Sequence, residues 1–138
     1  MIDTNTEFGS RVARRLKEEQ VIWLTTLDSH LTPQPRPVWF VWDGESFLIY
    51  SEPGTHKLEH IRRHAQVSLH LNSDEEGGDI VVFNGEARIA DEEPSADQVP
   101  AYIEKYREGI KGLNMSAETF AGSFSVPLRV RPTNLRGD

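Results

Sequence analysis

The chain contains no cysteine in its 138 residues. Disulfide bonds, thiolate metal sites and cysteine nucleophiles are therefore excluded. No apolar run approaches the roughly 20 residues of a membrane-spanning helix, and the polar segment 1–7 lacks the apolar core of a signal peptide. We therefore expect a cytoplasmic protein that has no membrane partner.

Positive charge is scarce, and motifs for covalent hydrolysis are missing. The 15 lysines and arginines are outnumbered by 22 aspartates and glutamates, which gives a net charge of −7 and a pI of about 5.2. We expect no nucleic-acid partner, because such proteins usually present a strongly basic face. No Gly-x-Ser-x-Gly nucleophile elbow is present. The acidic runs 74–76 and 91–93 fall in predicted loops, where solvated charge is favoured over paired-carboxylate catalysis.

The spacing of apolar residues predicts a mainly β fold of the α+β class, in a single domain over residues 1–138. The expected elements are a helix at 8–16, a strand at 21–27, a proline-rich edge segment at 32–37, strands at 38–42 and 47–50, a helix at 55–64, strands at 67–71 and 79–89, helices at 95–111 and 115–121, and a strand at 124–130. Short connections such as Asp43-Gly44 favour hairpins, and therefore a small antiparallel barrel with peripheral helices. The strands beside this turn are apolar on both faces, so we expect both faces to be covered. Gly85 is expected to mark a bulge or bend.

The stretch from Tyr50 to Lys57 is the most informative part of the sequence. It leaves an apolar strand, turns at Pro53-Gly54 and enters a helix at Thr55. Lys57 lies in the first turn of that helix, where the helix dipole makes a cation unfavourable. The hydroxyls of Ser51 and Thr55, together with Lys57, are suited to bind a phosphate group. The alternative is that Thr55 only caps the helix and Lys57 is solvated.

Arg36 is a second candidate binding residue. Pro35 and Pro37 flank it and hold its backbone extended. A stiff edge segment of this kind can present a guanidinium group and free backbone groups to a planar ligand. A solvent-exposed arginine is the alternative interpretation.

Histidines and tryptophans give weaker signals. The histidines of the predicted helix recur every four residues, at His56, His60 and His64. Three histidines over two turns are too spread to share one ion, so we favour surface histidines over a metal site. The tryptophans either line a ring-binding pocket or pack in a core or interface, and these are Trp23, Trp39 and Trp42.

Several segments together resemble the pyridoxamine 5'-phosphate oxidase-like split β-barrel superfamily, and most of all its F420-dependent deazaflavin branch. These segments are Thr32–Trp42, Leu48–Lys57, Gly78–Val82, Val99–Tyr106 and Arg131–Gly137. The resemblance covers nearly the whole chain. It implies a split antiparallel β-barrel that forms a homodimer, with two cofactor sites at the dimer interface.

The resemblance also implies which residues bind the cofactor. They are Arg36, Pro37, Val38, Trp39, Tyr50, Ser51, Thr55, His56 and Lys57. In the family, the lysine at the position of Lys57 contacts the phosphate of the cofactor tail, and Ser51 and Thr55 match its hydroxyl partners. Residues 36–39 match the strand beside the ring and ribityl chain.

The activity implied by the resemblance is that of an oxidoreductase that transfers a hydride between coenzyme F420 and a small organic substrate. Two alternatives stay open, an FMN-binding flavoprotein and a non-enzymatic carrier of F420. The pattern Ser51-x-x-x-Thr55-x-Lys57 differs from the arginine-richer pattern of true pyridoxamine-phosphate oxidases. This difference argues against vitamin B6 oxidation.

Overall fold

The structure is a computed structural model that describes residues 1–138. Its elements in chain order are α1 (Glu7–Glu18), β1 (Ile22–Leu27), β2 (Pro33–Val38), β3 (Val41–Trp42), β4 (Phe47–Ser51), α2 (His56–Arg63), β5 (Gln66–His70), β6 (Val81–Ile89), the 3-10 helix η1 (Ala96–Gln98), α3 (Pro100–Gly112), α4 (Ala117–Ser123) and β7 (Val126–Gly137). None of the helices is both long and apolar enough to cross a membrane.

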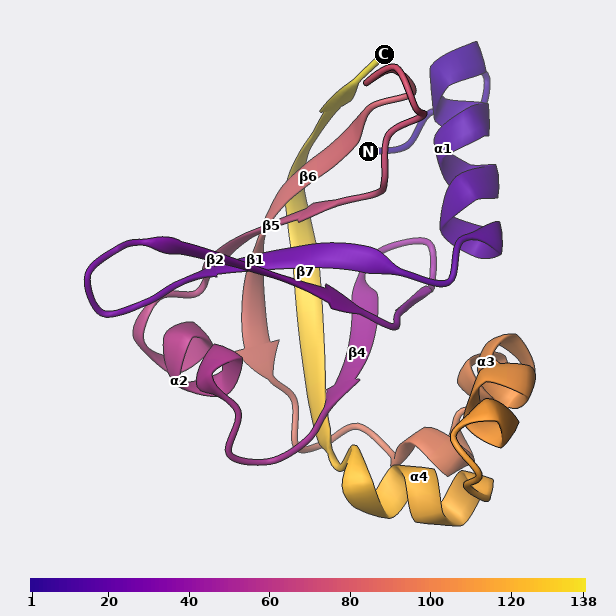
Figure 1. Cartoon of the computed structure of the whole chain (residues 1–138). Coiled ribbons are helices and arrows are strands. Elements are labelled where there is room, and N and C mark those ends of the chain that lie inside the picture. Colours follow the sequence, from indigo (N-terminus) through magenta and orange to yellow (C-terminus); the bar gives the residue numbers. More distant parts are fainter.

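All seven strands belong to one antiparallel sheet in the order β2-β1-β5-β6-β7-β4-β3. The two edge strands, β2 and β3, are separated in sequence only by Trp39 and Phe40. Such a link spans about 10 Å at most, so the sheet has to curl until its edges approach each other. The β1–β2 hairpin accordingly crosses over β7 in Figure 1. The expected split β-barrel is confirmed.

The proline-rich segment forms the edge strand β2, as its composition predicts. Its prolines alternate, at positions 33, 35 and 37, so all three missing N–H groups fall on one side of the strand. The residues between them can therefore still donate to β1, with which β2 pairs along its whole length. Proline suits such an edge strand, because the outer side of the strand needs no N–H donor.

The predicted strand 38–42 is interrupted, which corrects the sequence-based expectation. β2 ends at Val38, and β3 covers only Val41 and Trp42. At Phe40 the backbone partners come from α3 instead of a strand. The Phe40 N–H donates to the Tyr106 hydroxyl at 2.7 Å, and its carbonyl accepts from Lys105 Nζ at 3.0 Å. These contacts provide hydrogen-bond partners for the backbone N–H and carbonyl groups of Phe40, at the point where the chain passes from one edge of the sheet to the other.

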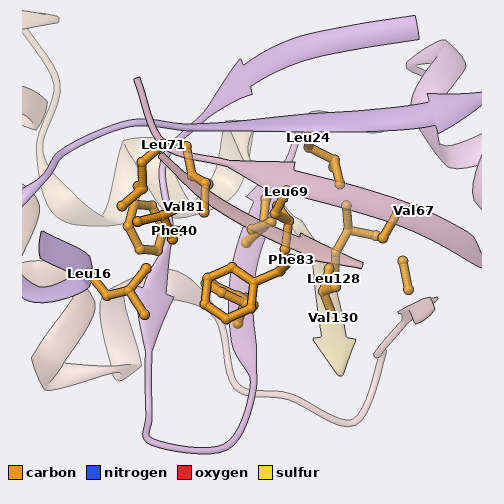
Figure 2. Packing of buried hydrophobic residues seen from close by; sticks show 14 of the residues in the cluster. Leu16, Leu24, Phe40, Val67, Leu69, Leu71, Val81, Phe83, Leu128 and Val130 are labelled. Atoms are coloured by element: carbon orange, nitrogen blue, oxygen red, sulfur yellow. The ribbon is translucent and has the colours of Figure 1, made fainter. Parts of the chain in front are cut away.

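The predicted covering of β4 on both faces is confirmed. Phe47 and Ile49 point into the main core inside the curled sheet. Figure 2 shows core side chains of several strands, among them Leu24, Leu69 and Val130, gathered in one cluster. Leu48 and Tyr50 instead join a second buried cluster with α3 and α4. These two helices lie together beside the lower end of β4 (Figure 1).

The last strand and the predicted helix 95–111 also differ from expectation. β7 runs to Gly137, well past the predicted end at 130, because a register shift at Asn84/Gly85 lets the strand continue through Pro132. A Cβ at Gly85 would lie 2.6 Å from the Arg131 carbonyl oxygen, which explains the glycine. The predicted helix 95–111 is divided. Ser95 donates to the Asp97 carboxylate at 2.6 Å and forms no cap, and α3 begins only at Pro100.

Candidate functional site

A pocket of about 370 Å³ lies where the chain crosses between the two edges of the sheet. It is built from the end of β2, the end of β4, the start of α2, and the helices α3 and α4. Eight of the nine predicted binding residues line it, namely Arg36, Pro37, Val38, Trp39, Tyr50, Ser51, Thr55 and Lys57. His56 does not line it and is exposed. The binding roles of all nine residues stay predictions.

A polar corner of this pocket is formed by the turn between β4 and α2. Gly54 has a φ of 76°, which glycine adopts easily and which suits the second central position of a Pro-Gly turn. The turn brings the Ser51 and Thr55 hydroxyl oxygens within 3.1 Å. Thr55 occupies the N-cap position, yet its side chain makes no capping hydrogen bond. The Ser51 hydroxyl donates to the Glu52 carbonyl oxygen at 2.9 Å, and the Thr55 hydroxyl donates to the same oxygen at 3.5 Å. Each hydroxyl can rotate from this acceptor toward a ligand.

Two cations lie at this corner, and the carboxylate of Glu52, which also lines the pocket, forms an ion pair with neither of them. Lys57 and Arg36 both line the pocket, and neither takes part in any ion pair of the chain. Burial lowers the pKa of Lys57, and the charge of Arg36 lowers it further, against a smaller opposing effect of Glu52. The fold thus holds two positive charges close together, an arrangement that an anion would relieve.

Another part of the pocket wall is aromatic. The Trp39 ring stacks on Tyr106, with ring centroids 4.5 Å apart, and on Phe120 at 5.6 Å. Gly109 of α3 makes room for it, because a Cβ there would lie 2.9 Å from the indole. Phe120 and Phe124 of the α4 region also line the pocket. This wall suits a planar ring.

The other two tryptophans lie elsewhere. Trp42 packs against Phe47, with ring centroids 4.7 Å apart, and so serves the core. Trp23 stacks on His70 at 6.1 Å and donates to the Asn72 side-chain oxygen at 2.9 Å. Only Trp39 among the tryptophans lines this pocket.

Sequence reasoning missed the contribution of the helices after β6. Tyr102, Leu113, Phe120 and Phe124 line the pocket, but nothing local in the sequence relates them to residues 36–57. The Tyr102 hydroxyl is buried and has no hydrogen-bond partner. The recurrence of aromatic residues at 102 and 106, one helical turn apart, is a signal that could have indicated this face.

The histidines of α2 do not converge on an ion site. His56 and His60 have ring centroids 6.5 Å apart. His60 Nδ1 lies 2.8 Å from the Thr26 hydroxyl of β1, so this residue ties α2 to the sheet. No group of three histidine, aspartate or glutamate side chains is arranged to hold a metal ion.

An antiparallel sheet curled until its edges nearly meet, with a pocket of cations and aromatic rings at the seam, defines a split β-barrel of the flavin-binding class. The chain belongs to the pyridoxamine 5'-phosphate oxidase family, whose model matches residues 8–129. None of the curated proteins is significantly similar to the chain.

Solved structures share this fold at low sequence identity. One is a provisionally assigned pyridoxamine 5'-phosphate oxidase of Listeria innocua, with a TM-score of 0.67, 24% identity, and coverage of 92% of this chain and 94% of that one. An F420 reductase has a TM-score of 0.64 at 19% identity and covers 89% and 94% of the two chains. The heme storage protein HutZ of Vibrio cholerae has a TM-score of 0.66 at 14% identity, with 96% and 95% covered. At such identities these similarities establish the fold alone.

Proposed function

We propose that the protein is an F420-dependent oxidoreductase that acts on a small organic substrate. The observation that carries this proposal is the pair of unpaired cations, Lys57 and Arg36, beside the Ser51–Thr55 hydroxyls at one corner of a pocket with an aromatic wall. A ligand that carries a phosphate and a flat ring, joined by a short chain, matches this polar corner and this aromatic wall. The volume of about 370 Å³ falls within the usual range for small-ligand pockets.

In this proposal the chain's own residues bind and orient the cofactor. Lys57 and Arg36 neutralise the phosphate, while Ser51 and Thr55 donate hydroxyl hydrogen bonds to it. Trp39 and its aromatic neighbours position the ring and exclude water from one of its faces. When bound, F420 supplies hydride transfer, so the protein needs no nucleophile or catalytic triad.

Support for F420 over other cofactors comes from two sources. The sequence segments around Arg36 and Lys57 resemble the deazaflavin branch, and one structural neighbour is an F420 reductase. The family name favours FMN as the second candidate, because the same pocket could hold its phosphate and ring. We also propose a homodimer, in which the exposed Leu113 at the pocket rim would be covered by the partner subunit.

Ligand binding tests the proposal directly. Protein purified from a host without F420 is titrated with F420 and, separately, with FMN, and binding is followed by fluorescence quenching. We expect F420 to bind more tightly than FMN. Lys57→Ala should weaken binding by about 1–3 kcal/mol, the range for a lost hydrogen bond to a charged group. Arg62→Ala is the matched control, because it removes the same charge from an exposed position of α2.

Three results would count against the proposal. Protein that is yellow with FMN on purification, and binds FMN more tightly, would favour the flavoprotein. Equal affinities of Lys57→Ala and Arg62→Ala would remove Lys57 from the site. Tight F420 binding without oxidation of reduced F420 by any of a panel of enones and quinones would favour a carrier.

A further inference from the structure

Tyr102 carries a hydroxyl group whose presence the packing of the protein does not explain. The residue is 0% exposed, lies on α3 and lines the pocket. Its hydroxyl oxygen is buried and has no hydrogen-bond partner. A buried polar group without a partner costs about 1–3 kcal/mol, and folded proteins contain few of them.

The neighbouring tyrosines of the same cluster behave differently. The Tyr50 hydroxyl donates to the Pro94 carbonyl oxygen at 2.6 Å. The Tyr106 hydroxyl accepts from the Phe40 N–H at 2.7 Å and lies 2.7 Å from the Gln20 carbonyl oxygen. Among these three tyrosines, only Tyr102 has a hydroxyl group without a hydrogen-bond partner.

The ring of Tyr102 alone accounts for its packing. It meets Tyr50 edge-on, with ring centroids 5.0 Å apart, and lies 4.9 Å from Tyr106. A phenylalanine would make the same contacts without burying a polar atom. The hydroxyl is therefore a cost to the ligand-free fold, and a bound ligand is the natural partner for a group on a pocket wall.

We infer that the Tyr102 hydroxyl is a binding group, which donates a hydrogen bond to an acceptor oxygen or nitrogen on the ring of the bound cofactor. The inference rests on the proposed function. The ring of Tyr102 packs against Phe120 of the aromatic wall and edge-on against Tyr50. Two cations are already available for the phosphate, so we assign the ring of the cofactor as the acceptor. Burial raises the pKa of Tyr102 strongly, with smaller effects from Tyr106 and Tyr50, so its phenol keeps the proton that it donates.

Tyr102→Phe and Tyr106→Phe test this inference as a matched pair. Both remove one phenolic oxygen from the same face of α3, and two quantities are measured for each. These are the free energy of unfolding of the ligand-free protein in urea, and the dissociation constants for F420 and FMN.

Tyr102→Phe should leave the ligand-free protein as stable as the wild type or more stable, and should weaken cofactor binding about three- to tenfold. Tyr106→Phe should lower the stability, because it removes the partner of the Phe40 N–H. A destabilised Tyr102→Phe would mean that the hydroxyl is satisfied inside the protein, and unchanged affinity would mean that it does not touch the cofactor. Either result overturns the inference.

The same titrations separate the two levels of the proposal. If the wild type binds F420 or FMN and Lys57→Ala weakens binding while Tyr102→Phe does not, only the role of Tyr102 fails. If the wild type binds neither cofactor, the proposed function fails and the inference fails with it.

Discussion

Gly109→Ala is a sharp test of how the aromatic wall is built. The added Cβ would lie 2.9 Å and 3.1 Å from two atoms of the Trp39 ring. The indole cannot easily move away, because it is stacked on Tyr106 at 4.5 Å between ring centroids and on Phe120 at 5.6 Å. Overpacking of this kind costs about 1–3 kcal/mol, against a gain of up to about 1 kcal/mol because alanine is the better helix former.

Gly112→Ala is the control for the gain in helix propensity that any change from glycine to alanine brings. Gly112 ends the same helix, and a Cβ there would have no neighbour within 4 Å. The difference in the free energy of unfolding between the two variants, measured by urea denaturation, should therefore be about 1–3 kcal/mol, with Gly109→Ala the less stable. Cofactor affinity should fall in Gly109→Ala only, since the displaced indole narrows the pocket. Two equally stable variants with equal affinities would refute this account of the wall.

Two further predictions concern pH and assembly. Because burial and Arg36 lower the pKa of Lys57, its charged form destabilises the ligand-free fold. The free energy of unfolding of the ligand-free protein should therefore increase as the pH rises from the lowered pKa of Lys57 in the folded protein to its higher pKa in the unfolded chain. The affinity for the anionic cofactor should fall over the same pH range, because Lys57 loses its charge. Lys57→Arg should remove both slopes, and a wild-type affinity that is constant through alkaline pH would contradict the prediction. Light scattering coupled to gel filtration should give twice the chain mass of 15.7 kDa, and a single-chain mass at micromolar concentration would exclude the homodimer.

The parts of the fold that depend on local pattern could be predicted from the sequence. The Asp43-Gly44 turn, the alternating prolines of β2 and the alternating core residues of β5 each have a nearby cause. The break at Trp39 and Phe40 could not be predicted, because its cause is distant. The backbone of Phe40 is satisfied by Tyr106, 66 residues further along the chain.

The candidate site divides in the same way. The turn between β4 and α2 carries Ser51, Thr55 and Lys57 close together in sequence. Their proximity in space therefore follows from the geometry of Pro53-Gly54. Arg36 joins them only through the curl of the sheet, and the resemblance to a family supplied that relation. The contribution of Tyr102 arises from the docking of α3, and no spacing in the sequence indicates that its hydroxyl lacks a partner.

The two-residue step between β2 and β3 has a consequence for the thermodynamics of the whole molecule. The pocket draws its walls from residues 36–39, 50–57 and 102–124, and these segments meet only when the step has been made and the sheet edges have come together. A ligand that contacts all three segments at once would bind the closed barrel and not a partly opened form. Such a ligand would raise the free energy of unfolding by RT ln(1 + L/Kd), where L is its free concentration, and this is about 2.7 kcal/mol at a ligand concentration one hundred times the Kd.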